Sequence, residues 1–229
     1  MLIKGLQKTT LLDYPSKVAA TIFTGGCNFR CPFCHNASLV EDLSASDNIS
    51  ENDVLSFLAK RRGILDGVCI TGGEPLLQRD ILDFCKKIRE LGLLIKLDTN
   101  GSRPDEFKKL IDEGLIDYIA MDIKNSKELY ATTCGLKDFP SEIEKSIDII
   151  MNSGIPYEFR TTVVRELHSK ESIDSLCRWI AGAERYYMQG FIDSGDLLGD
   201  GLSAYSTAEM EELLQIARVH IPTAELRGI

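Results

Sequence analysis

Three of the seven cysteines in this 229-residue chain fall within eight residues, in the string GGCNFRCPFCHN. They are Cys27, Cys31 and Cys34. Thiolates this close together can hold one metal centre. A structural zinc site normally has four protein ligands, whereas an iron–sulfur cluster held by three cysteines leaves one iron without a protein ligand. A substrate or cofactor could bind that open iron.

Other interpretations of the three cysteines compete with a cluster. Their spacing also suits one face of a helix, but Gly25, Gly26 and Pro32 disfavour a helix here. A zinc site with His35 as its fourth ligand stays open, although neighbours such as Cys34 and His35 rarely converge on one tetrahedral ion. The bacterial ferredoxin spacing requires a nearby fourth cysteine followed by proline, which the sequence lacks.

The cysteine string resembles the signature of the radical S-adenosylmethionine (SAM) enzymes, in which an aromatic residue, here Phe33, precedes the last cysteine. The following pair, His35 and Asn36, resembles the activating enzymes of glycyl radical enzymes. The stretches GLQKTTLLDYPSK and ATIFTGGCNFRCPFCHN are similar to anaerobic ribonucleoside-triphosphate reductase activating proteins. The resemblance implies one 4Fe-4S cluster, SAM on the open iron, a glycyl radical enzyme as partner, and an electron donor such as flavodoxin or ferredoxin.

Short apolar runs alternate with amphipathic segments along the chain. We predict strands over 18–24, 67–71, 93–99, 118–124, 157–164 and 186–191, and helices over 51–62, 79–92, 104–114, 141–154 and 170–182. This alternation predicts an α/β fold with a parallel sheet. Six βα units fit between residue 18 and about 205, too few for an eight-unit barrel. The resemblance implies a partial (β/α)6 TIM-type barrel of the radical SAM class.

Composition limits the number of domains, the class of partner and the cellular compartment. With 229 residues and 44% hydrophobic content, we expect one domain over 1–229, with an N-terminal extension over 1–17 and a C-terminal helix and tail over about 206–229. The net charge of −9 argues against nucleic acid as a partner. The sequence has no run of about eighteen apolar residues and its first residues do not resemble a signal peptide, so we expect no membrane partner and a reducing cytoplasm.

A glycine pair follows the second predicted strand, in TGGEP (71–75). Gly72 and Gly73 allow a tight turn between a strand and a helix, which alone would explain them. The motif also resembles the GGEP motif of radical SAM enzymes, which contacts the amino group of SAM. By that resemblance Gly72, Gly73 and Glu74 bind the cofactor.

Polar residues also stand where later strands end. Asp98 and Asp122 are expected on neighbouring strands, and paired carboxylates need a cation or a proton between them. Resemblance to pyruvate formate-lyase activase implies a monovalent cation held by Asp98, Thr99 and Asp122 beside SAM. In the same relatives Lys124 and Arg160 match positions that contact SAM; ion pairs with nearby carboxylates are the simpler alternative.

For the other four cysteines and two of the histidines, the sequence predicts only a location. In the core we expect Cys69, Cys85 and Cys177. Closer to the surface we expect Cys134, His168 and His220. The roles of these cysteines are not predicted.

The sequence therefore predicts a cytoplasmic radical SAM activase. It would cleave SAM reductively and abstract a hydrogen from a glycine of a partner enzyme, expected to be anaerobic ribonucleoside-triphosphate reductase. No side chain is singled out as catalytic. The alternatives are an activase of the pyruvate formate-lyase type, a small-molecule radical SAM enzyme such as 7-carboxy-7-deazaguanine synthase, and a non-enzymatic iron–sulfur or zinc-binding module.

Overall fold

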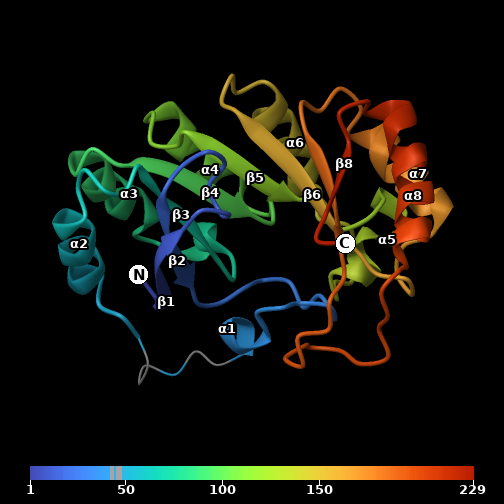
Figure 1. Ribbon diagram of the computed structural model, residues 1–229, viewed down its shortest axis with the longest axis horizontal. Helices are drawn as coiled ribbons and strands as arrows, with labels where there is room; N and C mark the ends of the chain where they lie inside the picture. The colour runs from blue at the N-terminus through green and yellow to red at the C-terminus, as the bar shows by residue number, and fades with distance from the viewer. Residues whose placement is uncertain (42–43, 45–47) are drawn as a thin grey trace. The chain divides into compact units, whose positions relative to one another are not determined.

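The computed structural model describes residues 1–41, 44 and 48–229 (Figure 1). Its strands are β1 (Ile3–Thr10), β2 (Ala19–Thr24), β3 (Gly67–Gly72), β4 (Leu94–Thr99), β5 (Tyr118–Asp122), β6 (Tyr157–Val163), β7 (Tyr186–Gly190) and β8 (Glu225–Arg227). Its helices are α1 (Ala37–Glu41), α2 (Glu51–Lys60), α3 (Ile81–Glu90), α4 (Pro104–Asp112), α5 (Lys127–Thr133), α6 (Glu142–Met151), α7 (Lys170–Trp179) and α8 (Thr207–His220), with a 3-10 helix, η2, over Pro75–Leu77.

The strands follow one another in one sheet in chain order. β1 pairs with β2 in antiparallel fashion, whereas the pairs β2–β3, β3–β4, β6–β7 and β7–β8 are parallel. In the described part of the chain β1 and β8 are the edge strands, and the sheet is not closed. The predicted α/β fold with six strand–helix repeats is confirmed; α8 is the helix that follows β7.

Two strands were not predicted, β1 and β8, and both lie at the sheet edges. β1 has the sequence IKGLQKTT, buries only its two end residues, and is interrupted by register shifts after Ile3 and Gln7. β8 has three residues. Edge strands with polar, irregular sequences lack the alternation that sequence patterns detect. Among the described residues no helix is both long and apolar enough to cross a membrane.

The chain forms two compact units. The first unit comprises Met1–Asn28, Ser38–Ala120 and Glu142–Pro156. The second unit comprises Phe29–Ala37, Met121–Ser141 and Tyr157–Ile229. The expectation of a single domain over 1–229 stays a prediction.

The parallel strands of the first unit carry nearly continuous apolar runs. Burial on both faces explains this pattern, as for Ile70 of β3 and Ile95 of β4, neither of which is exposed. Lys96 of β4 breaks the pattern, since its side chain is 2% exposed. Its ammonium group contacts the Asp98 carboxylate and lies 6.0 Å from the ring centroid of Tyr118. A buried lysine therefore ends next to a carboxylate at the carboxyl end of β4.

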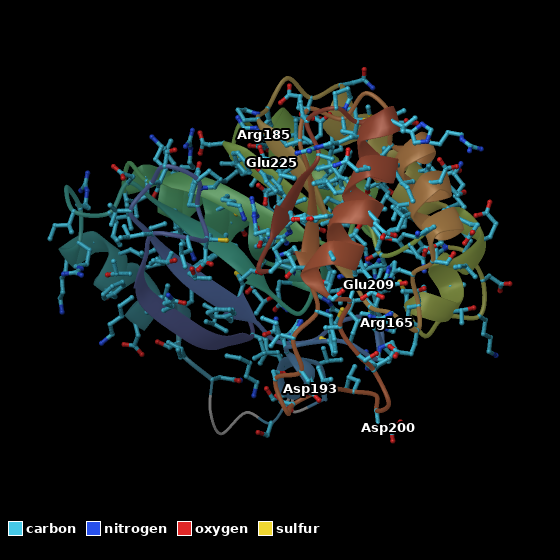
Figure 2. The ribbon with its side chains drawn as sticks, turned by 45° about the vertical axis from the view of Figure 1, so that its right-hand side comes forward. Arg165, Arg185, Asp193, Asp200, Glu209 and Glu225 are labelled. Carbon is cyan, nitrogen blue, oxygen red and sulfur yellow. The ribbon has the colours of Figure 1, made fainter. Side chains whose placement is uncertain are left out.

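In the second unit α7 and α8 lie side by side (Figure 1). A capping box starts α8: Ser206 accepts from the Glu209 amide, and Glu209 accepts from the Ser206 amide. Arg165 forms a two-pronged ion pair with the same Glu209, at 2.7 and 2.5 Å (Figure 2). The loop after β6 is thereby attached to the start of α8.

His168 was expected at the surface, and that expectation is wrong: only 1% of the residue is exposed. The Val164 amide donates to its Nδ1 over 3.0 Å, and its Nε2 lies 2.8 Å from the Lys124 carbonyl oxygen. This pattern fits a neutral imidazole with its proton on Nε2. Burial lowers the pKa of His168 below 6.5. The Lys124 partner, distant in sequence, could not be predicted from the residues around His168.

We predict that His168 lowers the stability of the protein as the pH falls below about 6.5. The unfolded chain binds a proton on this histidine near that pH, whereas the folded chain binds it only at lower pH. The free energy of unfolding should therefore fall by up to about 1.4 kcal/mol per pH unit. Urea unfolding of the metal-free, reduced protein over the range from about pH 7.5 to 5.5 measures this slope.

The His168→Gln variant should show a shallower slope than the wild type. The His220→Gln variant keeps the buried histidine and serves as the control for loss of a histidine. Burial also lowers the pKa of His35, which contributes in the same direction and is present in both variants. Equal slopes in the wild type and His168→Gln would contradict the prediction.

Candidate functional site

The first unit brings together the chain segments that follow β2, β3 and β4. The Gly73 amide donates to the Thr24 carbonyl over 2.9 Å, and the Glu74 amide donates to the Gly26 carbonyl over 2.8 Å. These bonds continue the β2–β3 pairing beyond the ends of the strands. The segment carrying Cys27 is thus held directly against the TGGEP segment.

Close backbone approach explains the glycine pair. A Cβ atom on Gly73 would lie 2.0 Å from the Gly26 carbonyl oxygen, closer than any real contact. Gly72 has φ +114°, and a Cβ there would lie 2.5 Å from backbone atoms of Thr24. Both positions require glycine whether or not a ligand binds.

Glu74 is fully buried, and its carboxylate holds two segments together. Oε1 accepts from the Leu76 amide at 3.0 Å and from the Thr99 hydroxyl at 2.9 Å. Oε2 accepts from the Asn100 amide at 2.7 Å. A buried charge is tolerated when it is hydrogen-bonded in this way. Glu74 and Thr99, both predicted to bind the cofactor, thus bind each other and fix the start of the segment after β4.

Asn100 connects that segment to the first motif cysteine. Its Nδ2 lies 3.7 Å from the Cys27 sulfur and donates to Asn28 Oδ1 over 3.1 Å. Asn28 in turn donates to the Ser102 hydroxyl over 2.9 Å. The sequence predicts none of these contacts, because Asp98, Thr99, Asn100 and Gly101 also suit an ordinary turn. An N–H group this close to a sulfur is suited to orient a metal-binding thiolate.

The second unit holds another cluster of charges, formed by Asp122, Lys124 and Arg160. Lys124 Nζ lies 2.9 Å from Asp122 Oδ2, and Arg160 Nε lies 2.9 Å from Asp122 Oδ1. Burial opposes ionisation of Asp122, but the attraction of Arg160 and Lys124 outweighs it and holds the pKa well below its usual range. Burial likewise opposes the charge on Lys124, and Asp122 and Cys31 outweigh it and raise the pKa.

The two carboxylates proposed to share a cation therefore each have an internal positive partner. Asp98 contacts Lys96, and Asp122 contacts Lys124 and Arg160. The repulsion that motivated the cation is already compensated within each unit. The monovalent cation stays a prediction, and charge balance does not demand it.

The other two motif cysteines lie in the second unit. The Cys34 amide donates to the Cys31 carbonyl over 3.1 Å, and the Arg30 amide donates to the Cys134 carbonyl over 2.9 Å. A hydrogen bond from the Cys134 thiol lowers the pKa of Cys31, against burial. Burial raises the pKa of Cys34. The expectation that Cys134 lies in an exposed loop is wrong, since it is fully buried at the end of α5.

Phe33 and His35 flank Cys34 and pack within the second unit. Phe33 is 3% exposed; its ring lies 6.4 Å from that of His168, and Lys124 Nζ lies 5.9 Å from its centroid. The His35 ring lies 5.9 Å from that of Phe191. Both aromatic side chains therefore help to shape the cysteine loop.

The donor set suits a four-iron cluster, because three thiolates satisfy three irons and leave the fourth open. In the residues that the structure describes, no three His, Cys, Asp or Glu side chains are arranged around a single ion position. Assigning Cys27, Cys31 and Cys34 to the cluster rests on their number and spacing. Their ligand roles, and those of the predicted SAM-binding residues, stay predictions.

Comparison with known proteins identifies the family. The model of the radical SAM superfamily matches residues 21–180. A Methanocaldococcus jannaschii protein, provisionally named a glycyl-radical enzyme activating enzyme, is 31% identical over 237 residues, which cover 100% of this chain and 96% of that protein. The 7-carboxy-7-deazaguanine synthase of Hyperthermus butylicus is 30% identical over 164 residues, covering 71% of this chain and 64% of the synthase.

A solved structure supports the fold. A domain of a pyruvate-formate lyase-activating enzyme from Bacteroides vulgatus matches with a TM-score of 0.59 and 19% identity, over 71% of this chain and 99% of that domain. The superfamily match spans more than half of the chain and includes all three motif cysteines. The chain therefore belongs to the radical SAM superfamily and is a radical SAM enzyme.

Proposed function

We propose that this enzyme activates a glycyl radical enzyme, and that the partner is an anaerobic ribonucleoside-triphosphate reductase. The observation that carries the activase assignment is the end-to-end similarity to the Methanocaldococcus jannaschii protein. The pair His35 and Asn36 after the last motif cysteine supports the same class. The reductase as partner is supported by the resemblance of the stretches 5–17 and 20–36.

Cys27, Cys31 and Cys34 would hold the 4Fe-4S cluster. When bound, the cluster and SAM would supply a one-electron reductive cleavage of SAM with release of methionine, the electron coming from a donor such as flavodoxin or ferredoxin, and with it the means to remove a hydrogen atom from a glycine Cα. Within this chain, Asn100 would orient the Cys27 thiolate and Cys134 would hydrogen-bond the Cys31 thiolate.

The predicted SAM-binding residues divide into two groups by their contacts. Glu74 and Thr99 are engaged with each other, so we assign them to positioning the segments after β3 and β4. We keep Gly72, Gly73, Phe33, Lys124 and Arg160 as residues that bind or enclose SAM. A monovalent cation at Asp98 and Asp122 stays a separate proposal, which equal activity in all monovalent salts would remove.

A small-molecule reaction is the second candidate, favoured by the 30% identity to 7-carboxy-7-deazaguanine synthase. That relative is matched over 71% of this chain, whereas the activase relative is matched over all of it.

Electron paramagnetic resonance tests the activase assignment directly. Anaerobic mixing of reduced enzyme, SAM and the reductase should give a glycine-centred doublet, and a reductase with that glycine replaced by alanine should give none. A doublet with a different glycyl radical enzyme alone would reject the reductase and keep the class. Absence of a doublet with every such enzyme, together with turnover of a small molecule, would reject the activase.

Iron content and SAM cleavage test the cluster assignment. Anaerobic reconstitution should give about four irons per chain. Alanine in place of Cys27, Cys31 or Cys34 should abolish reductive SAM cleavage. Cys85→Ala and Cys177→Ala, in α3 and α7, are matched controls that should keep it. Uptake of one zinc and no iron would contradict the assignment.

We also predict a distinct effect for Glu74→Gln. The neutral amide cannot accept from all three donors, so the free energy of unfolding should fall by about 1–3 kcal/mol. Displacement of the segments after β3 and β4 should weaken SAM binding by about tenfold or more, while the cysteines still assemble the cluster. Urea unfolding, iron content and SAM titration measure the three effects. Glu90→Gln, an exposed change in α3, is the control, and SAM affinity equal to that control would rule out a positioning role.

A further inference from the structure

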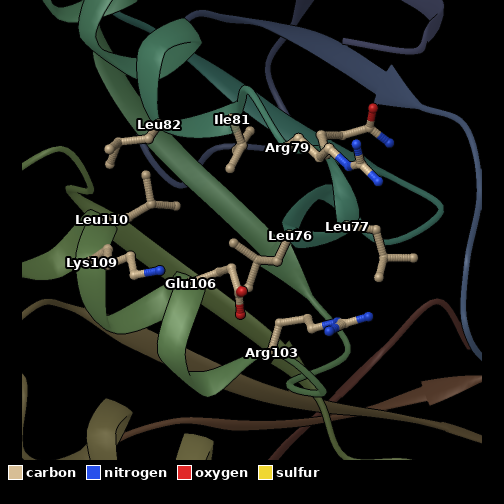
Figure 3. Close-up of a pocket in the computed structure, with 10 residues that line it drawn as sticks. Leu76, Leu77, Arg79, Ile81, Leu82, Arg103, Glu106, Lys109 and Leu110 are labelled. Carbon is tan, nitrogen blue, oxygen red and sulfur yellow. The ribbon is translucent and has the colours of Figure 1, made fainter.

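A cavity of about 460 Å³ opens in the first unit between the η2–α3 segment and α4 (Figure 3). Its apolar lining includes Leu76, Ile81 and Leu110, each no more than 4% exposed, and the half-buried Leu77 and Leu82. The volume lies within the range of small-ligand pockets. An aliphatic side chain from another molecule could fill it.

Charged side chains surround this apolar lining. Arg79, Arg103 and Lys109 are exposed cations, and Glu106 is the one anion among the lining residues. Within the part of the chain that the structure describes, none of the three cations has an ion-pair or side-chain hydrogen-bond partner. The pocket is thus locally positive in a protein whose net charge is −9. Unpaired arginines suit carboxylates, which they can bind through two parallel hydrogen bonds.

The lining also indicates the class of ligand. None of the lining residues is aromatic or glycine, so the pocket offers no ring on which a nucleotide base could stack and no glycine loop to cradle phosphates. Leucine and isoleucine suit an aliphatic side chain, and the arginines suit acidic residues beside it. An acidic peptide segment carrying leucine matches both features.

We propose that this pocket docks an acidic, leucine-containing segment of a partner protein. Electrostatic attraction would bring the segment to the cations, and the aliphatic anchor would hold it. The pocket lining begins at Leu76, two residues after Glu74, and Arg103 follows the segment that Glu74 holds. A docked partner would therefore contact the segments after β3 and β4. Docking needs neither cluster nor SAM, so it can fail independently of the proposed reaction.

Fluorescence anisotropy of the full-length, metal-free protein tests the pocket. The probe is a fluorescein-labelled octapeptide with two central leucines flanked by glutamates and aspartates. It should bind, and binding should weaken as salt is raised from about 50 to 300 mM. Replacing its leucines by serine, or its acidic residues by lysine, should each weaken binding about tenfold or more.

Charge reversal at the pocket distinguishes binding of the probe at this site from nonspecific electrostatic attraction to the protein surface. Arg103→Glu and Arg79→Glu should each weaken binding about tenfold or more. Arg62→Glu changes an exposed arginine outside the pocket by the same charge and should have a much smaller effect. Equal losses in Arg103→Glu and Arg62→Glu, or no binding of the probe up to about 1 mM, would overturn the proposal. Displacement of the probe by ATP, with ATP binding lost in Arg103→Glu, would identify the ligand of the pocket as a nucleotide instead of a peptide. That result would also overturn the proposal.

Discussion

The buried carboxylate of Glu74 is the interaction on which the arrangement of the segments after β2, β3 and β4 in the first unit depends. It accepts hydrogen bonds from the amides of Leu76 and Asn100 and from the Thr99 hydroxyl, with no part of the residue exposed. Without hydrogen-bond donors such a charge would be costly to bury. With them, the carboxylate fixes the relative position of two segments. Through Asn100 the same network reaches the Cys27 sulfur. Cysteine orientation in this unit thus depends on a residue remote from it in sequence.

In the second unit a carboxylate is stabilised by ion pairs. Asp122 accepts from Lys124 and Arg160, and Lys124 also lies over the ring of Phe33. The Lys124 carbonyl is held in turn by the imidazole of the buried His168. Three segments distant in sequence are therefore held around one carboxylate. The Asp122 carboxylate needs no added cation to balance its charge, although a charged ligand such as SAM could still compete for its two partners.

Much of the fold could be predicted because its repeats are regular. The six predicted strands and five predicted helices all formed, since buried parallel strands carry apolar runs and the helices carry apolar stripes. The edge strands β1 and β8 escaped prediction because their sequences are polar, irregular or short. Motif residues were found by type and spacing. Their contacts with Asn100, Cys134 and His168 could not be predicted, because each contact joins segments that only the folded chain brings together.

The contact between Gly73 and Gly26 limits how this sequence can vary. Most steric conflicts in a protein can be relieved by shrinking a neighbouring side chain, so a second substitution can compensate for the first. At Gly73 the obstacle is a backbone carbonyl oxygen, 2.0 Å from where a Cβ would stand, and no substitution at position 26 removes that atom. An evolutionary path that changes Gly73 would have to move the main chain of two segments at once. We therefore expect laboratory libraries built on this scaffold to recover glycine at position 73 even under selection for an unrelated property.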